Sequence, residues 1–262
     1  MVSRDNREET IKFFEDKNYF NYPKEQVKFF MQGEMPLIGE DRKFLLDKEG
    51  KIMLASDGNG SIYSSMKEKG ILEDMKEKGI EWIYICSVDN VLLQMVEPLL
   101  LGLTIEQKNQ IASKTIVKAN SEERVGAFCI KNGKPSVIEY TELPENMAKM
   151  TDEKGELLYG EAHIMCNLFS IKAIEKIAEK TLPYHIAFKK INHYIDGNLI
   201  EIEKPNAYKF EQFIFDSFPL FDNITLLRGK REENFAPVKN KEGNDSPKTA
   251  AELYNNYWKV NK

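Results

Sequence analysis

Two polar segments that directly follow short apolar runs limit how this chain can fold. Residues 82–86 are an apolar run before Val88-Asp89-Asn90, and residues 51–55 precede Asp57-Gly58-Asn59-Gly60. Glycines let the backbone approach another group closely, because no Cβ stands in the way. An acid at the carboxyl end of a strand lies where open α/β sheets place their ligands. The pattern therefore predicts an α/β sheet whose strand ends carry a binding site.

Helix and strand patterns alternate in the first third of the chain. Apolar positions at helical spacing predict helices over residues 6–18 and 62–78, and Gly79 is a stop signal for the second helix. Strands are predicted over residues 27–30, 51–55 and 82–86. The alternation of the two element types predicts a mixed sheet.

The middle of the chain changes to the period of two that is typical of strands. Asn132-Gly133 separates two such runs and is a strong hairpin signal. The further predicted strands cover residues 115–117, 125–130, 136–140, 162–169 and 224–227. The further predicted helices cover residues 170–180, 184–190, 210–218 and 247–258. We therefore predict a mixed α/β sheet with an antiparallel extension. Residues 1–228 would form its core, and residues 229–262 the closing loop and helix of the same core.

Composition excludes several classes of protein. The 262 residues carry a net charge of −5, which argues against a general nucleic-acid binder, because phosphate binding needs a basic surface. No apolar run approaches the roughly 18 residues that span a bilayer, and no apolar signal core follows Met1. The three cysteines form no C-x-x-C pair, which is typical of free thiols in a reducing compartment. We predict a cytoplasmic protein with neither nucleic-acid nor membrane partners.

Each polar motif has a structural explanation beside a chemical one. Residues 57–60 form an ordinary turn or a ligand-contacting turn. Asp89 is a helix N-cap or a ligand of Mg²⁺, which prefers oxygen donors. The alternating acids of Glu139-Tyr140-Thr141-Glu142 are solvated strand residues or acceptors for sugar hydroxyls.

The basic and aromatic candidates are equally open. Lys209 and Lys239 are solvent-facing side chains or point cations for phosphate. The aromatic cluster of residues 210–218 packs in a core or lines a sugar pocket. The three histidines lack metal-ligand spacing, and no G-x-S-x-G motif supports acyl transfer.

The order of the motifs carries more information than any one of them. The series runs through Gln32-Gly33, residues 55–60, residues 70–75, Gly79-Ile80, Val88-Asp89-Asn90, Val125-Gly126, residues 137–142, Lys204-Pro205-Asn206, residues 213–216, residues 235–240 and residues 247–250. As an ordered set it resembles the eukaryotic-type UDP-N-acetylglucosamine pyrophosphorylases of the UDP-sugar pyrophosphorylase family, from about residue 8 to residue 258.

The resemblance implies a fold and a reaction. The fold would be glycosyltransferase-A-like, a Rossmann-like mixed sheet. The reaction would be that of a uridylyltransferase, in which UTP and an N-acetylhexosamine or hexose 1-phosphate give a UDP-sugar and pyrophosphate, with Mg²⁺ as cofactor. Positioning and electrostatics would carry this reaction without a protein nucleophile.

The resemblance also implies site residues. Gln32 and Gly58 would contact uracil, and Asp89 would hold Mg²⁺ beside the phosphates. Lys209 would reach the phosphates of UTP and Lys239 the sugar-phosphate side. The implied sugar contacts are Asn59, Gly126, Glu139, Tyr140, His163, Phe213 and Phe215, besides Lys239.

Three departures from the family pattern leave alternatives open. Family members carry an N-terminal region with a glycine-rich nucleotide loop, and this chain begins after it, so we expect an N-terminally incomplete sheet. Ala162-His163-Ile164 replaces the family Gly-Asn-Ile, and Ser61 stands where a second glycine is usual. The alternative function is a non-catalytic UDP-sugar-binding fragment, or one subunit of a split enzyme with a separate N-terminal chain. A glycosyltransferase would need a D-x-D-like motif, which Val88-Asp89-Asn90 matches poorly.

Overall fold

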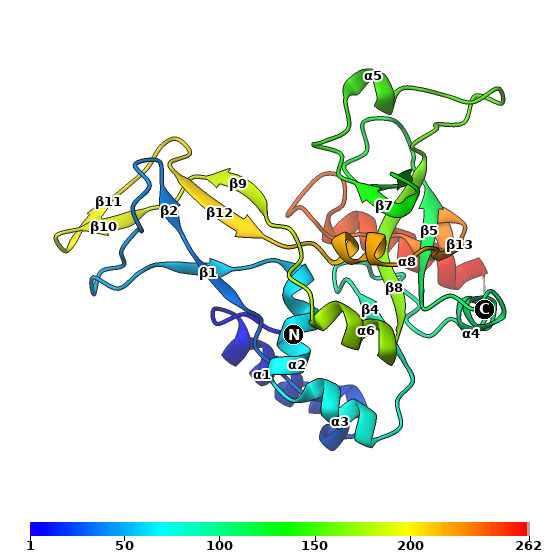
Figure 1. Cartoon of the computed structure of the whole chain (residues 1–262), viewed down its shortest axis with the longest axis horizontal. Coiled ribbons are helices and arrows are strands. Elements are labelled where there is room, and N and C mark those ends of the chain that lie inside the picture. Colours follow the sequence, from blue (N-terminus) through cyan, green and yellow to red (C-terminus); the bar gives the residue numbers. More distant parts are fainter. Residues whose placement is uncertain (261–262) are drawn as a thin grey trace. The chain divides into compact units, whose positions relative to one another are not determined.

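The computed structural model describes residues 1–260, and its chain forms two compact units (Figure 1). Unit 1 contains Met1–Gly79 and Glu175–Ser217. Unit 2 contains Ile80–Ile174 and the described chain from Phe218 onward. The boundary that the sequence predicts at residue 228 stays a prediction.

Unit 1 is built from short elements around small antiparallel sheets. Its helices are α1 (Arg7–Asp16), α2 (Ile62–Glu68) and α3 (Ile71–Glu77), with the 3₁₀ turns η1 (Asn18–Asn21), η2 (Lys24–Gln26) and η3 (Asn59–Ser61). Its strands are β1 (Glu34–Pro36), β2 (Ile38–Gly39), β3 (Leu54–Ser56), β9 (His185–Lys189), β10 (His193–Ile195), β11 (Asn198–Ile200) and β12 (Ala207–Glu211). They pair in the orders β2-β12-β9, β1-β3 and β10-β11 (Figure 1). A cluster of Leu37, Leu45 and Ala207 is buried under this part of the chain.

Unit 2 is a six-stranded mixed sheet. Its strands are β4 (Trp82–Cys86), β5 (Ile111–Val117), β6 (Ala127–Lys131), β7 (Lys134–Ile138), β8 (Glu161–Ser170) and β13 (Thr225–Arg228). Its helices are α4 (Pro98–Glu106), α5 (Glu145–Ala148), α7 (Arg231–Asn234) and α8 (Pro247–Val260); α6 (Ile171–Ala178) and the 3₁₀ turn η4 (Ile214–Leu220) contribute residues to both units. The order is β13-β5-β8-β6-β7, with β4 also paired to β8 (Figure 1). Among the described strand pairs of this sheet, only β13 and β5 are parallel, so the predicted mixed sheet with an antiparallel extension is confirmed.

An irregularity in β8 shapes the sheet where it meets β5. Lys114 lies opposite Cys166, but the next residue, Thr115, lies opposite His163. Two residues of β8 are therefore extra, and Met165 takes a positive φ of 51°. The bulge shortens the distance along the strand between His163 and Asn167, so their side chains meet on one face.

Several sequence predictions of local structure are wrong. The pattern of residues 184–190 predicts a helix, but β9 forms there because His185–Lys189 pair along their whole length with β12. Residues 27–30 form no strand, and the single bridge near them joins Met31 to Val2. The helix predicted over residues 62–78 is broken by Gly70, which adopts a left-handed conformation with φ 69°. Residues 210–218 finish β12 and then form a 3₁₀ turn.

Other predictions are confirmed. The strand over residues 82–86 and the helix from Pro247 form where predicted. Asn132 and Gly133 both have positive φ, 53° and 74°, as the tight turn between β6 and β7 requires. None of the described helices combines the length and the apolar character that crossing a membrane requires.

Candidate functional site

The glycine-rich turn of unit 1 packs against the chain's own backbone. Gly60 N–H donates to the carbonyl of Gln212 at 2.8 Å, and Gln212 N–H donates to the carbonyl of Asp57 at 2.7 Å. A Cβ on Gly60 would lie 2.8 Å from backbone atoms of Gln212 and Phe213. Gly58 has a φ of 90°, and a Cβ there would lie 2.7 Å from Gln212 N. The glycines therefore allow close packing onto residues 212–213.

This packing brings three of the predicted sugar contacts together. The side-chain oxygen of Asn59 accepts a hydrogen bond from Ile214 N–H at 2.9 Å. The rings of Phe213 and Phe215 lie 5.2 Å apart, and Phe215 is buried while Phe213 keeps some exposure. Unit 1 therefore ties the Asn59 amide to the backbone of the segment that carries Phe213 and Phe215.

Sequence reasoning missed two residues of this group. The His185 ring lies 4.6 Å from the Phe213 ring, and its Nε2 is 3.0 Å from Asp216 Oδ2. The same carboxylate oxygen accepts a hydrogen bond from Phe213 N–H at 3.1 Å. No signal in the sequence could have paired His185 with Asp216, because β9 reaches this position only through its pairing with β12.

The predicted nucleotide contacts of unit 1 lie in different surroundings. Gln32 N–H donates to the carbonyl of Val2 at 2.9 Å. Its neighbour Gly33 packs against the Asp57 carboxylate, and Asp57 Oδ1 is fully enclosed with no hydrogen-bond partner among the described residues. Burial raises the pKa of Asp57. Lys209 Nζ lies 2.8 Å from Glu211 Oε1, so its charge is already matched by an acid.

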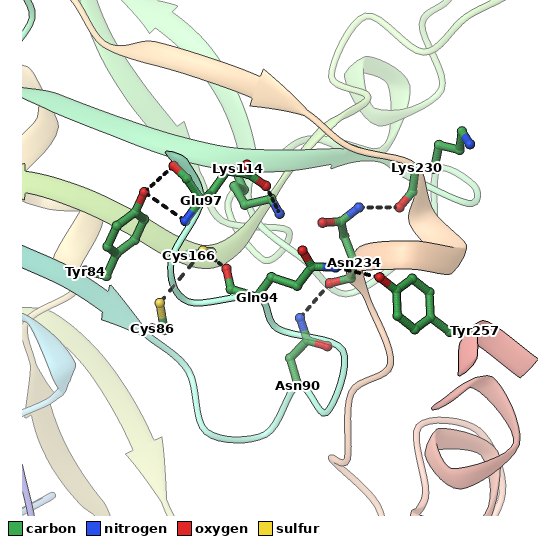
Figure 2. Close-up of polar contacts among 10 residues, drawn as sticks. All are labelled: Tyr84, Cys86, Asn90, Gln94, Glu97, Lys114, Cys166, Lys230, Asn234 and Tyr257. Carbon is green, nitrogen blue, oxygen red and sulfur yellow. Dashed lines mark hydrogen bonds and ion pairs between the residues drawn. The ribbon is translucent and has the colours of Figure 1, made fainter. Parts of the chain in front are cut away.

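In unit 2, an amide joins the two segments that carry Asp89 and Lys239. Asn90 Nδ2 donates to the carbonyl of Asn234 at 2.8 Å (Figure 2). Asn90 Oδ1 accepts a hydrogen bond from Ala236 N–H at 2.9 Å. Val238 N–H then donates to the carbonyl of Asp89 at 2.8 Å. The segment after β4 and the residue before Lys239 are thus hydrogen-bonded neighbours, although about 150 positions separate them in the chain.

The Asp89 side chain has no basic partner among the described residues. Ser87 Oγ donates a short hydrogen bond to Asp89 Oδ1. Lys239 Nζ lies 5.9 Å from the centroid of the Phe235 ring. Within residues 1–260 no three His, Cys, Asp or Glu side chains gather as a metal-binding group. A cation at Asp89 would therefore need further oxygen ligands from water or substrate.

Three of the predicted sugar contacts of unit 2 meet at the edge of the hairpin. His163 N–H donates to the carbonyl of Gly126 at 2.9 Å. A Cβ on Gly126 would lie 2.7 Å from Val137 Cγ1 and 3.3 Å from Glu139 Oε1. Tyr140 follows with an exposed side chain. The structure therefore places both His163 and Glu139 beside Gly126.

His163 is held as a neutral imidazole. Its Nε2 lies 3.1 Å from Asn167 Oδ1, and its ring meets those of Phe128 and Phe218 edge-on at 5.4 and 5.8 Å. Burial lowers the pKa of His163 to about 4. The Asn167 oxygen that faces Nε2 suits the neutral tautomer with its proton on that nitrogen. Asn167, which sequence reasoning missed, fixes the ring and keeps its own enclosed Nδ2 without a partner among the described residues.

Comparisons with known proteins identify the family. The model of the family described as UTP–glucose-1-phosphate uridylyltransferase matches residues 1–254. UDP-N-acetylglucosamine diphosphorylase 2 of Arabidopsis thaliana is 38% identical over 95% of this chain and 50% of its own length. The UDP-N-acetylglucosamine pyrophosphorylase of Saccharomyces cerevisiae is 35% identical over 97% of this chain and 55% of its own length.

A solved structure agrees with these sequences. The uridine diphosphate N-acetylglucosamine pyrophosphorylase from Trypanosoma brucei, in complex with an inhibitor, has a TM-score of 0.83 and 30% identity. The match covers 95% of this chain and 51% of that one. The chain spans about half the length of the curated relatives it matches. On these matches, the chain belongs to the UTP–glucose-1-phosphate uridylyltransferase family and is similar within it to the UDP-N-acetylglucosamine pyrophosphorylases of eukaryotes.

Proposed function

We propose that this chain is a uridylyltransferase or part of one. The enzyme would react UTP with an N-acetylhexosamine or hexose 1-phosphate to form a UDP-sugar and release pyrophosphate. The family and the names of the relatives support the reaction class. The observation that carries the proposal is the hydrogen bond between Val238 N–H and the carbonyl of Asp89. This hydrogen bond holds the segments that carry Asp89 and Lys239 next to each other in unit 2. Both side chains are expected at phosphates.

The fold we propose is glycosyltransferase-A-like. Strands β4 and β5 both run antiparallel to β8, so their carboxyl ends lie at the same edge of the unit 2 sheet. Asp89 follows β4 at that edge, and Gly126 lies beside His163 near the end of β5. Ligands of open α/β sheets bind outside this edge.

The proposed reaction is an in-line displacement. A phosphate oxygen of the sugar 1-phosphate forms a bond to the α-phosphorus of UTP, and the bond from that phosphorus to the bridging oxygen breaks. Pyrophosphate leaves with the electron pair. Lys239 would offset charge on the sugar-phosphate side and Lys209 on the nucleotide side. Such catalysis depends on positioning and electrostatics.

Asp89 fits the role of a Mg²⁺ ligand in this reaction. Its carboxylate follows a strand end, is partly exposed and has no basic partner among the described residues. Mg²⁺ is commonly held by one or two carboxylates, with waters and substrate phosphates completing the shell. When bound, the ion would neutralise charge on the phosphate oxygens. The Ser87 hydroxyl would orient Asp89 through its hydrogen bond.

The remaining roles follow the chemistry of each group. Gln32 and Gly58 would contact uracil, and Asn59, oriented by Ile214, would contact the sugar. Glu139 would accept hydrogen bonds from sugar hydroxyls, and Gly126 leaves room beside it. The further proposed sugar contacts are Tyr140, His163, Phe213 and Phe215.

The test is binding followed by turnover. A thermal-shift titration with UDP-N-acetylglucosamine, UDP-glucose and UTP, each with Mg²⁺, should raise the melting temperature, because a ligand of the native state stabilises it. Asp89→Asn should reduce the Mg²⁺-dependent part of the shift, and the exposed Asp152→Asn should leave it unchanged. No shift with any uridine nucleotide would refute the proposal.

Pyrophosphate release from UTP and N-acetylglucosamine 1-phosphate then tests catalysis. Release by the purified chain would establish the transferase. Binding without release would assign a non-catalytic UDP-sugar-binding protein. Release only after a second chain with a glycine-rich loop is added would assign one subunit of a split enzyme.

A further inference from the structure

Two of the chain's three cysteines face each other across neighbouring strands of unit 2. Cys86 is the last residue of β4, and Cys166 lies directly opposite it in β8. Their Sγ atoms are 3.8 Å apart (Figure 2). Both are free thiols; Cys166 is buried and Cys86 is partly exposed. Neither has a role in the proposed reaction, so the pair is a separate chemical feature of the sheet.

The backbone at this position suits a bond between the two sulfurs. Ser87 N–H donates to the carbonyl of Met165 at 3.0 Å, one position beyond the cysteine pair. Cys86 and Cys166 are therefore a non-hydrogen-bonded pair of the antiparallel ladder, in which opposite Cα atoms lie about 4.5 Å apart. Disulfides span Cα separations of roughly 4.4–6.8 Å and have an S–S bond of about 2.05 Å. Rotation of the two side chains can close the remaining gap without moving the strands apart or together.

A buried cation lies beside the pair. Lys114 of β5 is directly opposite Cys166, so the two cysteines and this lysine form a row across β4, β8 and β5. Lys114 is 4% exposed, and its Nζ lies 3.1 Å from Glu97 Oε2. The S–H of Cys86 donates to the sulfur of Cys166. This hydrogen bond, and after it the charge of Lys114, lowers the pKa of Cys166, which favours loss of a proton from the pair.

The third cysteine provides an internal comparison. Cys129 of β6 lies opposite Ser136 of β7, so its cross-strand neighbour carries no sulfur. It is a free thiol with partial exposure, like Cys86. Burial raises the pKa of Cys129. A reagent that reaches partly exposed thiols in unit 2 therefore meets one cysteine with a sulfur neighbour and one whose cross-strand neighbour is a serine.

We propose that Cys86 and Cys166 are a redox-active thiol pair, which a hydroperoxide oxidises to an intramolecular disulfide. After Cys86 loses its proton, its sulfur attacks one oxygen of hydrogen peroxide, the O–O bond breaks, and Cys86 becomes a sulfenic acid while the other oxygen leaves as water. The Cys166 sulfur then attacks the Cys86 sulfur, the S–S bond forms, and the hydroxyl leaves as water with the proton of Cys166. The pair loses two electrons and two protons in total, and the peroxide becomes two molecules of water.

The proposal does not depend on the proposed function, because it uses only thiol chemistry and the pairing of β4 with β8. A thiol reductant reverses the oxidation by disulfide exchange. Disulfides of this kind in a reducing compartment are typically transient and redox-sensing.

The experiment oxidises the folded, full chain with equimolar hydrogen peroxide at low protein concentration, and then alkylates the remaining thiols in denaturant. Peptide mapping by mass spectrometry without reductant should find Cys86 linked to Cys166, and Cys129 alkylated. Dithiothreitol should return both linked cysteines to thiols. The matched control Cys129→Ser should form the same disulfide, and Cys166→Ser should form none. If Cys86 and Cys166 are both alkylated after oxidation, or reach the sulfinic acid without a cross-link, the inference is overturned.

Thermal unfolding of the same samples tests whether the native fold accommodates the bond. The two cysteines are 80 positions apart in the chain, so a disulfide between them restricts the unfolded state. The oxidised wild-type chain should therefore melt at a higher temperature than the reduced chain. Cys129→Ser should show the same increase on oxidation. A melting temperature of the oxidised wild type at or below that of the reduced protein would refute the inference, because the bond would then distort β4 and β8.

Discussion

Protonation linked to His163 should lower the free energy of unfolding of unit 2 at pH values above those at which most carboxylates are protonated. In the folded protein its pKa is lowered to about 4 by burial, whereas an unfolded imidazole has a pKa of about 6.5. Between these values the unfolded state binds the proton and the folded state does not. The free energy of unfolding therefore falls as pH decreases. The contribution is fully present above about pH 6.5 and is lost as pH approaches 4.

The magnitude follows from the two pKa values. The shift of roughly 2.5 units corresponds to a total of about 3 kcal/mol. Most of this loss, about 2 kcal/mol, should occur between pH 7 and pH 5, because the unfolded imidazole is then largely protonated. His163→Gln removes the titration and keeps an N–H that can face Asn167 Oδ1.

The assay is urea unfolding at pH 7, 6 and 5, followed by tryptophan fluorescence. Trp82 and Trp258, the two tryptophans of the chain, both belong to unit 2, so the signal reports on the unit that contains His163. The wild-type chain should lose about 2 kcal/mol more than His163→Gln between pH 7 and pH 5. If both proteins lose the same stability over this range, His163 is not held neutral by burial.

Three further substitutions test the packing around the candidate site. Gly60→Ala should destabilise the protein by about 2 kcal/mol, measured by urea unfolding, because its Cβ would meet backbone 2.8 Å away. Gly102→Ala, which has open space around it and no positive φ, is the steric control and should cause no loss of stability. Asn90→Ala should destabilise the protein by about 2–3 kcal/mol in the same assay and weaken the Mg²⁺-dependent thermal shift, and a normal shift would contradict the proposed link to Asp89. Glu97→Gln should cost about 3 kcal/mol by leaving Lys114 buried and unpaired, whereas the exposed Glu106→Gln should be neutral in the same assay.

Elements with local causes can be predicted from the residues alone. Residues 82–86 are apolar and β-branched or aromatic at most positions, and they form β4 as predicted. Asn132 and Gly133 tolerate positive φ, so they close the hairpin wherever the flanking strands pair. The ordered motifs are enough to indicate the family, because their spacing reflects the order of strand ends along the chain.

Which side chains meet depends instead on pairings between distant parts of the chain. Residues 185–189 pattern like a short helix, and pairing with β12 makes them a strand that carries His185 to Asp216. The two-residue bulge in β8 brings His163 to Asn167, and no local preference specifies a bulge there. The buried Lys114 finds its ion-pair partner in Glu97, which lies 17 positions earlier in the chain. Charge and hydrogen-bond compensation are set by distances in space, so the sequence names the candidate groups and the fold decides which of them can bind a ligand.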